Sequence, residues 1–405
     1  MKTKIILLCC LFALQIVQGQ DLESLLKIGV ENSPSLQKFE LKYLGVSEKK
    51  NEANSLPNTE FGFGYFVSEP ETKTGPQRLK VSVKQMIPWF GSISSREAYS
   101  QSLAEVSYED IQIAKRKLIA SISEQYYTLL AIKAKQKVVK ENKALLVIYE
   151  KLALKAIEVS KASAVDVLRL QMRQNELQQL ALVLDQNFRA QQAALNLLLN
   201  RAKETPIQIP EVMELPKEEV LLTNKKLGVH PELLKYDKLY QSVIKSELVN
   251  QKENKPMIGF GLDYIAISKL PVANLNDNGK DVFMPMVSLS IPIFNKKYHS
   301  KTLQNELKQH EIISEKQERL NALKTLLETA KTNRVVARIR YETQVKNSEQ
   351  AKSAEKLLLQ NYETGTVNFK EVLEIQELQL QFQTNQIEAV KSFFVQTTII
   401  NYLSK

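Results

Sequence analysis

Cysteine and histidine are scarce in this chain, and their scarcity excludes several kinds of site. The only two cysteines, Cys9 and Cys10, lie in an apolar stretch near the start. The three histidines, His230, His299 and His310, stand in no ligand-spaced motif. No glycine-rich phosphate loop and no nucleophile elbow occurs. We therefore expect no disulfide, no cofactor, no soft-metal site and no enzymatic activity.

Residues 1–19 have the pattern of a cleaved secretory signal. Lys2 and Lys4 form a basic start, residues 5–14 an apolar core, and residues 17–19 a small-residue cleavage site. Both cysteines lie inside the core rather than at its end, which argues against acylation. After this segment no apolar run approaches the roughly 18–20 residues of a transmembrane helix. If the mature chain crosses a membrane, strands must do so.

Glycine and proline are absent from Ser92 to Thr205, and only Gly365 interrupts the stretch from Ile293 to Lys405. Apolar residues recur at helical spacing through both stretches, with charged and amide residues between them. Each stretch is too long for one globular-domain helix, so we expect two helical hairpins that turn near Ser160–Ser163 and at Gly365. Lysines and glutamates are interspersed, so the formal net charge of +10 indicates solvated helix surface rather than a nucleic-acid site.

Most of the 12 glycines and 13 prolines lie in two windows, 57–91 and 256–292. Period-2 alternation replaces the helical period there, and each window predicts a hairpin of two strands of about 10 residues. The residues predicted for the apolar face are Phe61, Phe63, Tyr65, Val67, Leu79, Val81, Val83, Ile258, Phe260, Leu262, Tyr264, Phe283, Val287, Leu289 and Ile291.

An apolar strand face usually covers a soluble core, but the rest of this chain is long amphipathic helix with nothing to cover it. Strands of this length and alternation match the wall of an outer-membrane β-barrel. Four strands cannot close a barrel, and an open edge is not viable in lipid. The alternation therefore predicts an obligate oligomer in which other copies complete the wall.

The two halves of the chain repeat, which indicates a tandem duplication. Asp166–Gln171 matches Glu371–Gln376 at an offset of 205, and Met86–Phe90 matches Ser290–Phe294 at an offset of 204. The predicted organisation is a signal (1–19), a first repeat (20–205, with a β-hairpin over 57–91 and a helical hairpin over 92–205), a proline-punctuated linker (206–228) and a second repeat (229–405, with a β-hairpin over 256–292 and a helical hairpin over 293–405). Ser33 and His230 each precede a proline that suits a helix start.

The mature chain resembles the TolC-like outer-membrane efflux proteins over essentially its whole length. The resemblance is carried by the helix starts at Asn32–Leu36 and His230–Leu233, by the two proline-bounded hairpins, and by Asn361–Thr366 followed by Val372 and Leu373. It implies a mainly α fold whose coiled-coil hairpins form an α-barrel. It also implies that each chain of a trimer adds four strands to a 12-stranded barrel.

The resemblance further implies a passive duct in the outer membrane that extends into the periplasm and has no cofactor. An inner-membrane transporter would supply the substrate through a periplasmic adaptor. Glu371 and Glu374 match carboxylates of the pore constriction, and their spacing places them on one helix face. A solvated helix face would have the same spacing, so that alternative stays open.

Tyr362 and Asp166 match two members of a closed-state latch, but Val367 stands at the basic position and Ser160 replaces a glycine of the first turn. The adaptor is expected to dock at the hairpin turns. The docking residues expected there are Ala162, Ala164, Val165, Gly365, Thr366 and Val367.

Two other functions fit parts of the sequence. A periplasmic coiled-coil adaptor or structural scaffold would explain the helices and the export signal, but not the duplicated β-hairpins. The outer-membrane duct of a type I protein secretion system would have the same architecture with a polypeptide as its substrate.

Overall fold

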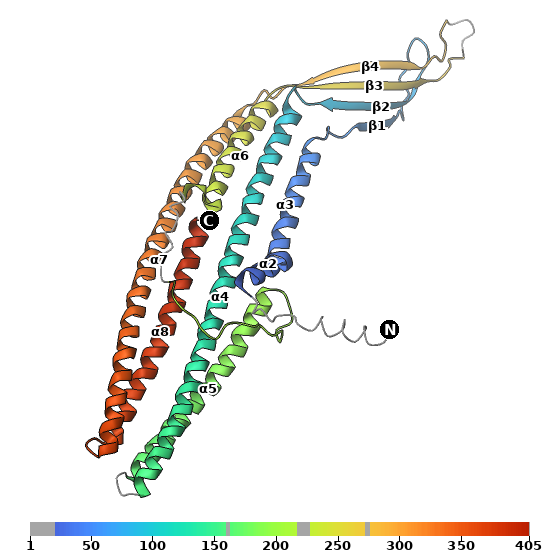
Figure 1. Ribbon diagram of the computed structural model, residues 1–405. Helices are drawn as coiled ribbons and strands as arrows, with labels where there is room; N and C mark the ends of the chain where they lie inside the picture. The colour runs from blue at the N-terminus through green and yellow to red at the C-terminus, as the bar shows by residue number, and fades with distance from the viewer. Residues whose placement is uncertain (1–20, 159–162, 217–226, 272–275, 405) are drawn as a thin grey trace, which may run out of the picture. The chain divides into compact units, whose positions relative to one another are not determined.

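The computed structural model describes residues 21–158, 163–216, 227–271 and 276–404, which form long helices and one antiparallel sheet (Figure 1). The predicted signal lies outside the described residues. The chain divides into two compact units. The first, here called the helical unit, comprises Met1–Gln37, Ile113–His230 and Asn321–Lys405. The second, the sheet unit, comprises Lys38–Gln112 and Pro231–Leu320.

The two glycine- and proline-poor stretches form the predicted helical hairpins. In the first, α4 (Ser92–Glu158) is followed by the antiparallel α5 (Ala164–Leu198) (Figure 1). In the second, α7 (Lys296–Thr364) is followed by α8 (Phe369–Ser404). A fold that is mainly α with a β portion is confirmed. Within the described residues no helix is both long enough and apolar enough to cross a membrane.

Three shorter helices complete the helical part of the chain. They are α2 (Leu22–Asn32), α3 (Pro34–Ala53) and α6 (Pro231–Glu253), and a one-turn 3-10 segment, η1 (Leu227–Val229), precedes α6. Two of these helices, α3 and α6, begin at the predicted prolines. The Ser33 hydroxyl accepts the Leu36 N–H at 3.3 Å. The predicted helix start at Ser33 is confirmed, because its side chain satisfies one backbone donor that the first turn leaves free.

The four predicted strands form one sheet. Its strands are β1 (Glu60–Tyr65), β2 (Gln77–Ile87), β3 (Met257–Ile267) and β4 (Val282–Ser290), in the order β1-β2-β3-β4. All neighbours are antiparallel, and the pairing of β2 with β3 joins the two predicted hairpins (Figure 1). Each repeat thus contributes half of a four-stranded sheet.

The strand register gathers on one side of the sheet the predicted apolar residues that lie within the strands. Val67 and Ile291 fall outside the strands, and β1, at 6 residues, is shorter than predicted. Phe61 pairs with Val83, Val81 with Tyr264, and Phe260 with Val287, and directly opposed residues share a face. We call this side the aromatic face. Its side chains are uncovered in one chain: Phe61 is 76% exposed, Phe63 74% and Val287 74%. The opposite side, here called the polar face, carries serines, glycines, lysines and methionines.

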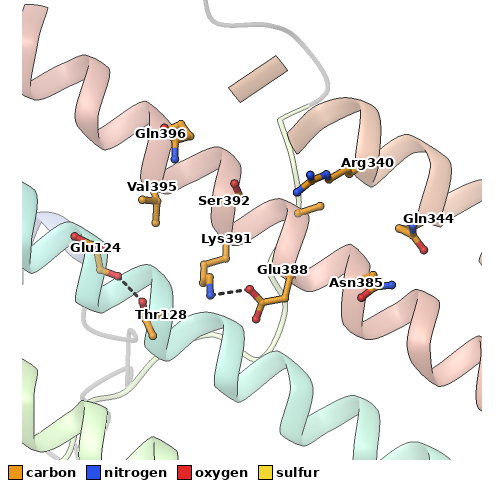
Figure 2. Close-up of a pocket in the computed structure, with 11 residues that line it drawn as sticks. Glu124, Thr128, Arg340, Gln344, Asn385, Glu388, Lys391, Ser392, Val395 and Gln396 are labelled. Carbon is orange, nitrogen blue, oxygen red and sulfur yellow. Dashed lines mark hydrogen bonds and ion pairs between the residues drawn. The ribbon is translucent and has the colours of Figure 1, made fainter. Parts of the chain in front are cut away.

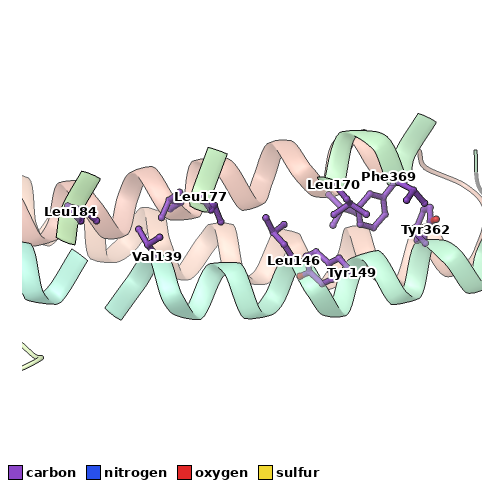
Figure 3. Packing of buried hydrophobic residues seen from close by; sticks show 12 residues of the cluster. Val139, Leu146, Tyr149, Leu170, Leu177, Leu184, Tyr362 and Phe369 are labelled. Atoms are coloured by element: carbon purple, nitrogen blue, oxygen red, sulfur yellow. The ribbon is translucent and has the colours of Figure 1, made fainter. Parts of the chain in front are cut away.

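The helical unit holds the largest hydrophobic cluster, here called the tip core, which lies between the two helical hairpins (Figure 3). Its buried residues are Val139, Leu146, Tyr149, Ala153, Val167, Leu170, Leu177, Leu184, Tyr362, Phe369, Val372 and Leu380. A second cluster includes Ile207 of the predicted linker, and a third includes Leu215. The described part of the linker therefore packs on the helices.

Some apolar positions of the helices point away from these cores. Ile148 and Leu154 belong to the heptad-like pattern of α4, yet both are exposed, as are Leu168 and Met172 of α5. Burial of only one apolar stripe leaves a second stripe uncovered in a single chain. Exposed apolar residues grouped in this way indicate a surface that can pack against another protein.

Candidate functional site

The turn between α7 and α8 begins with a glycine in a left-handed conformation. Gly365 has φ +77°, its N–H donates to the Tyr362 carbonyl at 2.9 Å, and the Thr366 N–H donates to the Asn361 carbonyl at 2.9 Å. This pair of bonds is the Schellman motif, which terminates a helix and is favoured by glycine because side chains strain in that conformation. The turn predicted at Gly365 is therefore confirmed.

The turn between α4 and α5 ends in a capping box at the start of α5. The Ser163 hydroxyl accepts the Val165 N–H at 3.2 Å, and the Asp166 carboxylate accepts the Ser163 N–H at 3.3 Å. Arg169 lies 3.7 Å from the same carboxylate. Asp166 thus has a structural role in stabilising the first turn of α5. Ser160 and Ala162, which the sequence places in this turn, lie outside the described residues.

Tyr362 and Asp166, the two predicted latch residues, both lie in the helical unit. Tyr362 is only 5% exposed, and its ring packs edge-on against Phe369 with centroids 4.9 Å apart. Burial raises the pKa of Tyr362, and the negative charge of Asp166 raises it further. Among the described residues the Tyr362 hydroxyl has no hydrogen-bond partner. The structure brings the two residues within electrostatic range without a hydrogen bond between them.

Glu371 and Glu374 lie on the exposed face of the first turns of α8. Phe369 and Val372 are fully buried in the tip core, so the two glutamates stand on the side of the helix away from it. Glu374 pairs with Lys370 at 3.4 Å, and both side chains are well exposed. Glu371 stands in the first turn, where the helix dipole favours a carboxylate. One chain therefore presents both carboxylates together, as their spacing predicts.

The described docking residues divide into two groups. Ala164, Val165, Gly365 and Thr366 are exposed. Val367 is half-buried and packs against the tip core. A substitution at Val367 would therefore disturb the core as well as the surface, and one at Gly365 would strain the turn. The Thr366 hydroxyl donates to the Asn361 carbonyl at 2.9 Å, so Ala164 and Val165 are the positions that report on the surface alone.

A buried polar layer crosses the tip core, and the sequence patterns do not predict it. The Tyr149 hydroxyl of α4 donates to Glu355 of α7 at 2.5 Å, and Gln376 of α8 donates to Asn142 of α4 at 2.7 Å. Burial raises the pKa of Tyr149 and the hydrogen bond to Glu355 raises it further. The signal available in the sequence was Asn142 and Tyr149, seven residues apart within an apolar stripe. This layer joins the hairpin of one repeat to that of the other.

An open polar cleft of about 680 Å³ lies between α4, α7 and α8 in the helical unit (Figure 2). Arg340 lines one side of it and Glu388 another. Glu388 accepts hydrogen bonds from Lys135 at 2.5 Å and from Lys391 at 2.6 Å. Burial would raise the pKa of Glu388, but the two lysines outweigh burial and lower it. Glu388 is therefore a neutralised structural carboxylate rather than a free acid or base.

His230 directly precedes α6, at the helix start that the sequence predicts. His230 is buried beside the start of α6, with its ring edge-on to Tyr402 at 5.2 Å, and His299 and His310 are exposed on α7. Over the part of the chain that the structure describes, no three histidine, cysteine, aspartate or glutamate side chains gather in an arrangement that could hold a metal ion.

No protein-family model matches this sequence, and no curated protein matches it in sequence. Solved structures do match its fold. The outer membrane protein VceC of Vibrio cholerae is 16% identical with a TM-score of 0.74, over 95% of this chain and 96% of that one. CusC is 12% identical with a TM-score of 0.77, over 97% and 96%. The CmeC outer membrane channel of Campylobacter jejuni is 13% identical with a TM-score of 0.73, over 95% and 85%.

This chain has the TolC-like fold. The match extends over nearly the full length of each partner, so both helical hairpins and all four strands take part in it. At 12–16% identity these matches show that the fold is shared and nothing about individual side chains. The roles of individual residues in this chain must therefore be argued from their own surroundings.

Proposed function

We propose that this protein is an outer-membrane exit duct that passively conducts substrates delivered by an inner-membrane transporter. The observation that supports this proposal most strongly is the aromatic face, an uncovered apolar side of a four-stranded sheet in a TolC-like fold. Apolar residues pointing outward and polar residues pointing inward are what a lipid-embedded barrel requires. The solved structures with this fold include channels of the outer membrane, which supports the same location for this chain.

The duct is a homotrimer in this proposal. β1 and β4 are the edges of the sheet, and unpaired backbone groups in lipid cost several kcal/mol each. Pairing β4 of one copy with β1 of the next, three times, closes a 12-stranded barrel. The exposed stripe of Ile148, Leu168 and Met172 supports contacts between copies along the helices as well, which would form the α-barrel.

A periplasmic adaptor docks at the helical turns in this proposal. The exposed small and apolar residues of the two turns, Ala164, Val165, Gly365 and Thr366, support this assignment, because helical hairpins pack closely where side chains are small. Ala162 is assigned to the same surface from its sequence position. The energy for transport comes from the inner-membrane transporter, and this chain performs no catalytic step.

The gate lies at the same turns in this proposal. Three copies would bring Glu371 and Glu374 together as two carboxylate rings at the pore constriction. Tyr362 and Asp166 would act as a closed-state latch through electrostatic contact, which is weak because Val367 supplies no charge. We expect Tyr362→Phe to raise single-channel conductance without lowering stability, and unchanged conductance would remove Tyr362 from the latch.

Three measurements test the duct. Native mass spectrometry of detergent-extracted protein should give a trimer, and the trimer should conduct ions across a planar lipid bilayer. The protein should also stay in the outer-membrane fraction after a carbonate wash. A scaffold or adaptor without an anchor would be released by that wash. A stable monomer with full strand content by circular dichroism would contradict the shared barrel.

A further inference from the structure

A small pocket of about 190 Å³ lies in the sheet unit, where the strands meet the helices (Figure 1). β2 ends at Ile87 and α4 begins at Ser92, while α6 ends at Glu253 and β3 begins at Met257. We call this the junction pocket. Pockets for drug-sized ligands measure roughly 300–1,000 Å³, so the junction pocket suits one small chemical group. Its polar lining includes Trp89, Ser92, Arg96, Lys252, Glu253 and Lys255.

Hydrogen-bond donors dominate the polar lining of the junction pocket. Lysine and arginine side chains can only donate, and so can the indole N–H of tryptophan. The acidic residue of the lining, Glu253, is paired with Arg96, whose Nε and a terminal nitrogen lie 3.0 and 2.9 Å from one carboxylate oxygen. Lys252 and Lys255 therefore leave the pocket with a net positive charge. The complementary ligand is an anion with several acceptor oxygens.

Among the residues that the structure describes, neither Lys252 nor Lys255 forms an ion pair. Lys252 belongs to the last turn of α6, where the helix dipole favours a cation. Its side chain nevertheless extends to the start of α4, because a Cβ atom on Gly91 would stand 3.3 Å from its Nζ and 3.4 Å from its Cε. The start of a helix carries partial positive charge. An anion in the pocket would be attracted to both the ammonium and the helix start.

The frame of the junction pocket is fixed by contacts between α4 and α6. Ser92 is 2% exposed, and its hydroxyl donates to the Lys252 carbonyl at 3.5 Å. The ion pair of Arg96 with Glu253 joins the same two helices one turn further along α4. Only the ends of the lysine side chains would have to be ordered when a ligand binds, which keeps the entropic cost of binding small.

Uncovered apolar side chains follow the strands at this end of the sheet. Phe90 comes directly after Trp89, and Ile293 and Phe294 come shortly after β4; all three are largely exposed. In the proposed duct this is the level at which the lipid-facing wall ends. Tryptophan and basic residues gather at that depth in membrane proteins, beside the phosphates of the lipid headgroups.

We propose that the junction pocket binds a phosphate group through Lys252 and Lys255, with the indole N–H of Trp89 as a further donor. Phosphate supplies the negative charge and the acceptor oxygens that the lining lacks, and lysine is a common phosphate ligand. The group could belong to a phospholipid headgroup or to a soluble phosphate, and the chemistry of recognition is the same. The lipid source rests on the proposed function, whereas the soluble source depends on the sheet unit alone.

The test uses Trp89 as its own reporter, because it is the only tryptophan in the chain. The purified full-length protein in an uncharged detergent is titrated with inorganic phosphate and, separately, with short-chain phosphatidylglycerol, while tryptophan emission is recorded. We expect a saturable change in emission that weakens as ionic strength rises, since salt screens the attraction. Lys252→Gln with Lys255→Gln should weaken the affinity by about tenfold or more. Tighter binding of phosphatidylglycerol assigns the site to lipid, and equal or tighter binding of inorganic phosphate assigns it to a soluble phosphate.

Lys352→Gln with Lys356→Gln is the matched control, because it removes the same charge from exposed positions near the end of α7; the affinity should not change. No response to either probe, equal affinity in the variant of the pocket lysines, or an equal loss in the control would overturn the phosphate site. Circular dichroism of each variant confirms that the fold is retained.

Conductance and the carbonate wash of the same protein separate this test from the proposed function. A protein that conducts but responds to neither probe refutes the phosphate site alone. A protein that binds inorganic phosphate through the two lysines, but is released by the wash and does not conduct, refutes the duct alone.

Discussion

Gln174 and Gln379, which are 205 residues apart, make the same pair of hydrogen bonds in the two helical hairpins. Each side-chain amide donates to a backbone carbonyl and to a glutamate on the preceding helix. The acceptors are the Leu146 carbonyl at 3.3 Å and Glu150 at 2.9 Å for Gln174, and the Ala351 carbonyl at 3.1 Å and Glu355 at 2.8 Å for Gln379. These partners are themselves 205 residues apart, so the repeat persists in side-chain contacts.

The two glutamines differ in burial, which leads to the first prediction. Gln379 is 5% exposed, whereas Gln174 is half-buried. Gln379→Ala should lower the free energy of unfolding by about 1–3 kcal/mol, since the buried Ala351 carbonyl and the half-buried Glu355 carboxylate lose a donor. Gln174→Ala should cost under about 1 kcal/mol, because water replaces the amide. Denaturant unfolding followed by circular dichroism measures both, and equal losses would mean that burial does not distinguish the two glutamines.

The second prediction contrasts two buried tyrosines of the tip core. The Tyr149 hydroxyl donates to Glu355, whereas the Tyr362 hydroxyl has no hydrogen-bond partner among the described residues. Tyr149→Phe should cost about 1.5–3 kcal/mol, the value of a hydrogen bond to a charged group. Tyr362→Phe should be neutral or stabilising. Thermal unfolding of the two variants checks the difference, and a greater loss at Tyr362 would reverse the assignment.

The same tyrosines predict how stability responds to alkaline pH. Burial, then Glu355 or Asp166, raises the pKa of Tyr149 and Tyr362 above the ordinary value, so the folded state favours the neutral phenol. The stabilisation is complete below the unfolded pKa of about 10 and is lost as pH rises from there toward the folded pKa. Replacing both tyrosines with phenylalanine should flatten the fall in stability above that pH. An unchanged alkaline profile would contradict the shifts.

The third prediction distinguishes the two faces of the sheet. Phe260→Arg or Val81→Arg should destabilise the membrane-inserted protein by about 2–4 kcal/mol near the bilayer midplane. Ser82 pairs with Asp263 and Ser288 with Gly259 on the polar face, so arginine at either serine should be tolerated. Unfolding from lipid vesicles measures the difference. Equal tolerance on both faces would mean that the sheet does not lie in lipid.

The fourth prediction concerns docking at the first helical turn. Ala164→Glu with Val165→Glu should abolish efflux in cells while the trimer still assembles, because bulky charges prevent close packing of another helical hairpin. Asn175→Glu, on the exposed surface of α5, is the matched control and should leave efflux intact. Drug or metal tolerance and native gels give the two readouts. Normal tolerance in the double variant would exclude this turn from the adaptor surface.

The fifth prediction concerns the pore constriction. Two rings of three carboxylates should make the channel cation-selective and sensitive to block by trivalent cations from the periplasmic side. Glu371→Gln with Glu374→Gln should remove both the selectivity and the block. Glu377→Gln, further along α8, should change neither. Planar bilayer recordings measure the reversal potential and the block, and wild-type behaviour in the double variant would place the constriction elsewhere.

The local elements of this protein could be predicted from the sequence because they depend on short-range patterns. Long stretches without glycine or proline predict helices, since glycine and proline interrupt helices. Gly365 predicts the turn, since its left-handed conformation strains other residues. Alternation in the strands predicts two faces, and the register keeps Phe61, Val81 and Phe260 on one of them. Even the repeat offset of 205 is readable without coordinates.

Contacts between distant residues were decided only by the tertiary structure. The pairing of β2 with β3 and the contact of Tyr149 with Glu355 each join the two repeats, and no spacing rule relates residues across such distances. Phe369 is fully buried beside Tyr362. The sequence predicts the nearby turn at Gly365 but not the burial of Phe369. Local patterns determine which faces are apolar, whereas packing between the repeats determines which side chains meet, because those contacts depend on three-dimensional position rather than on separation along the chain.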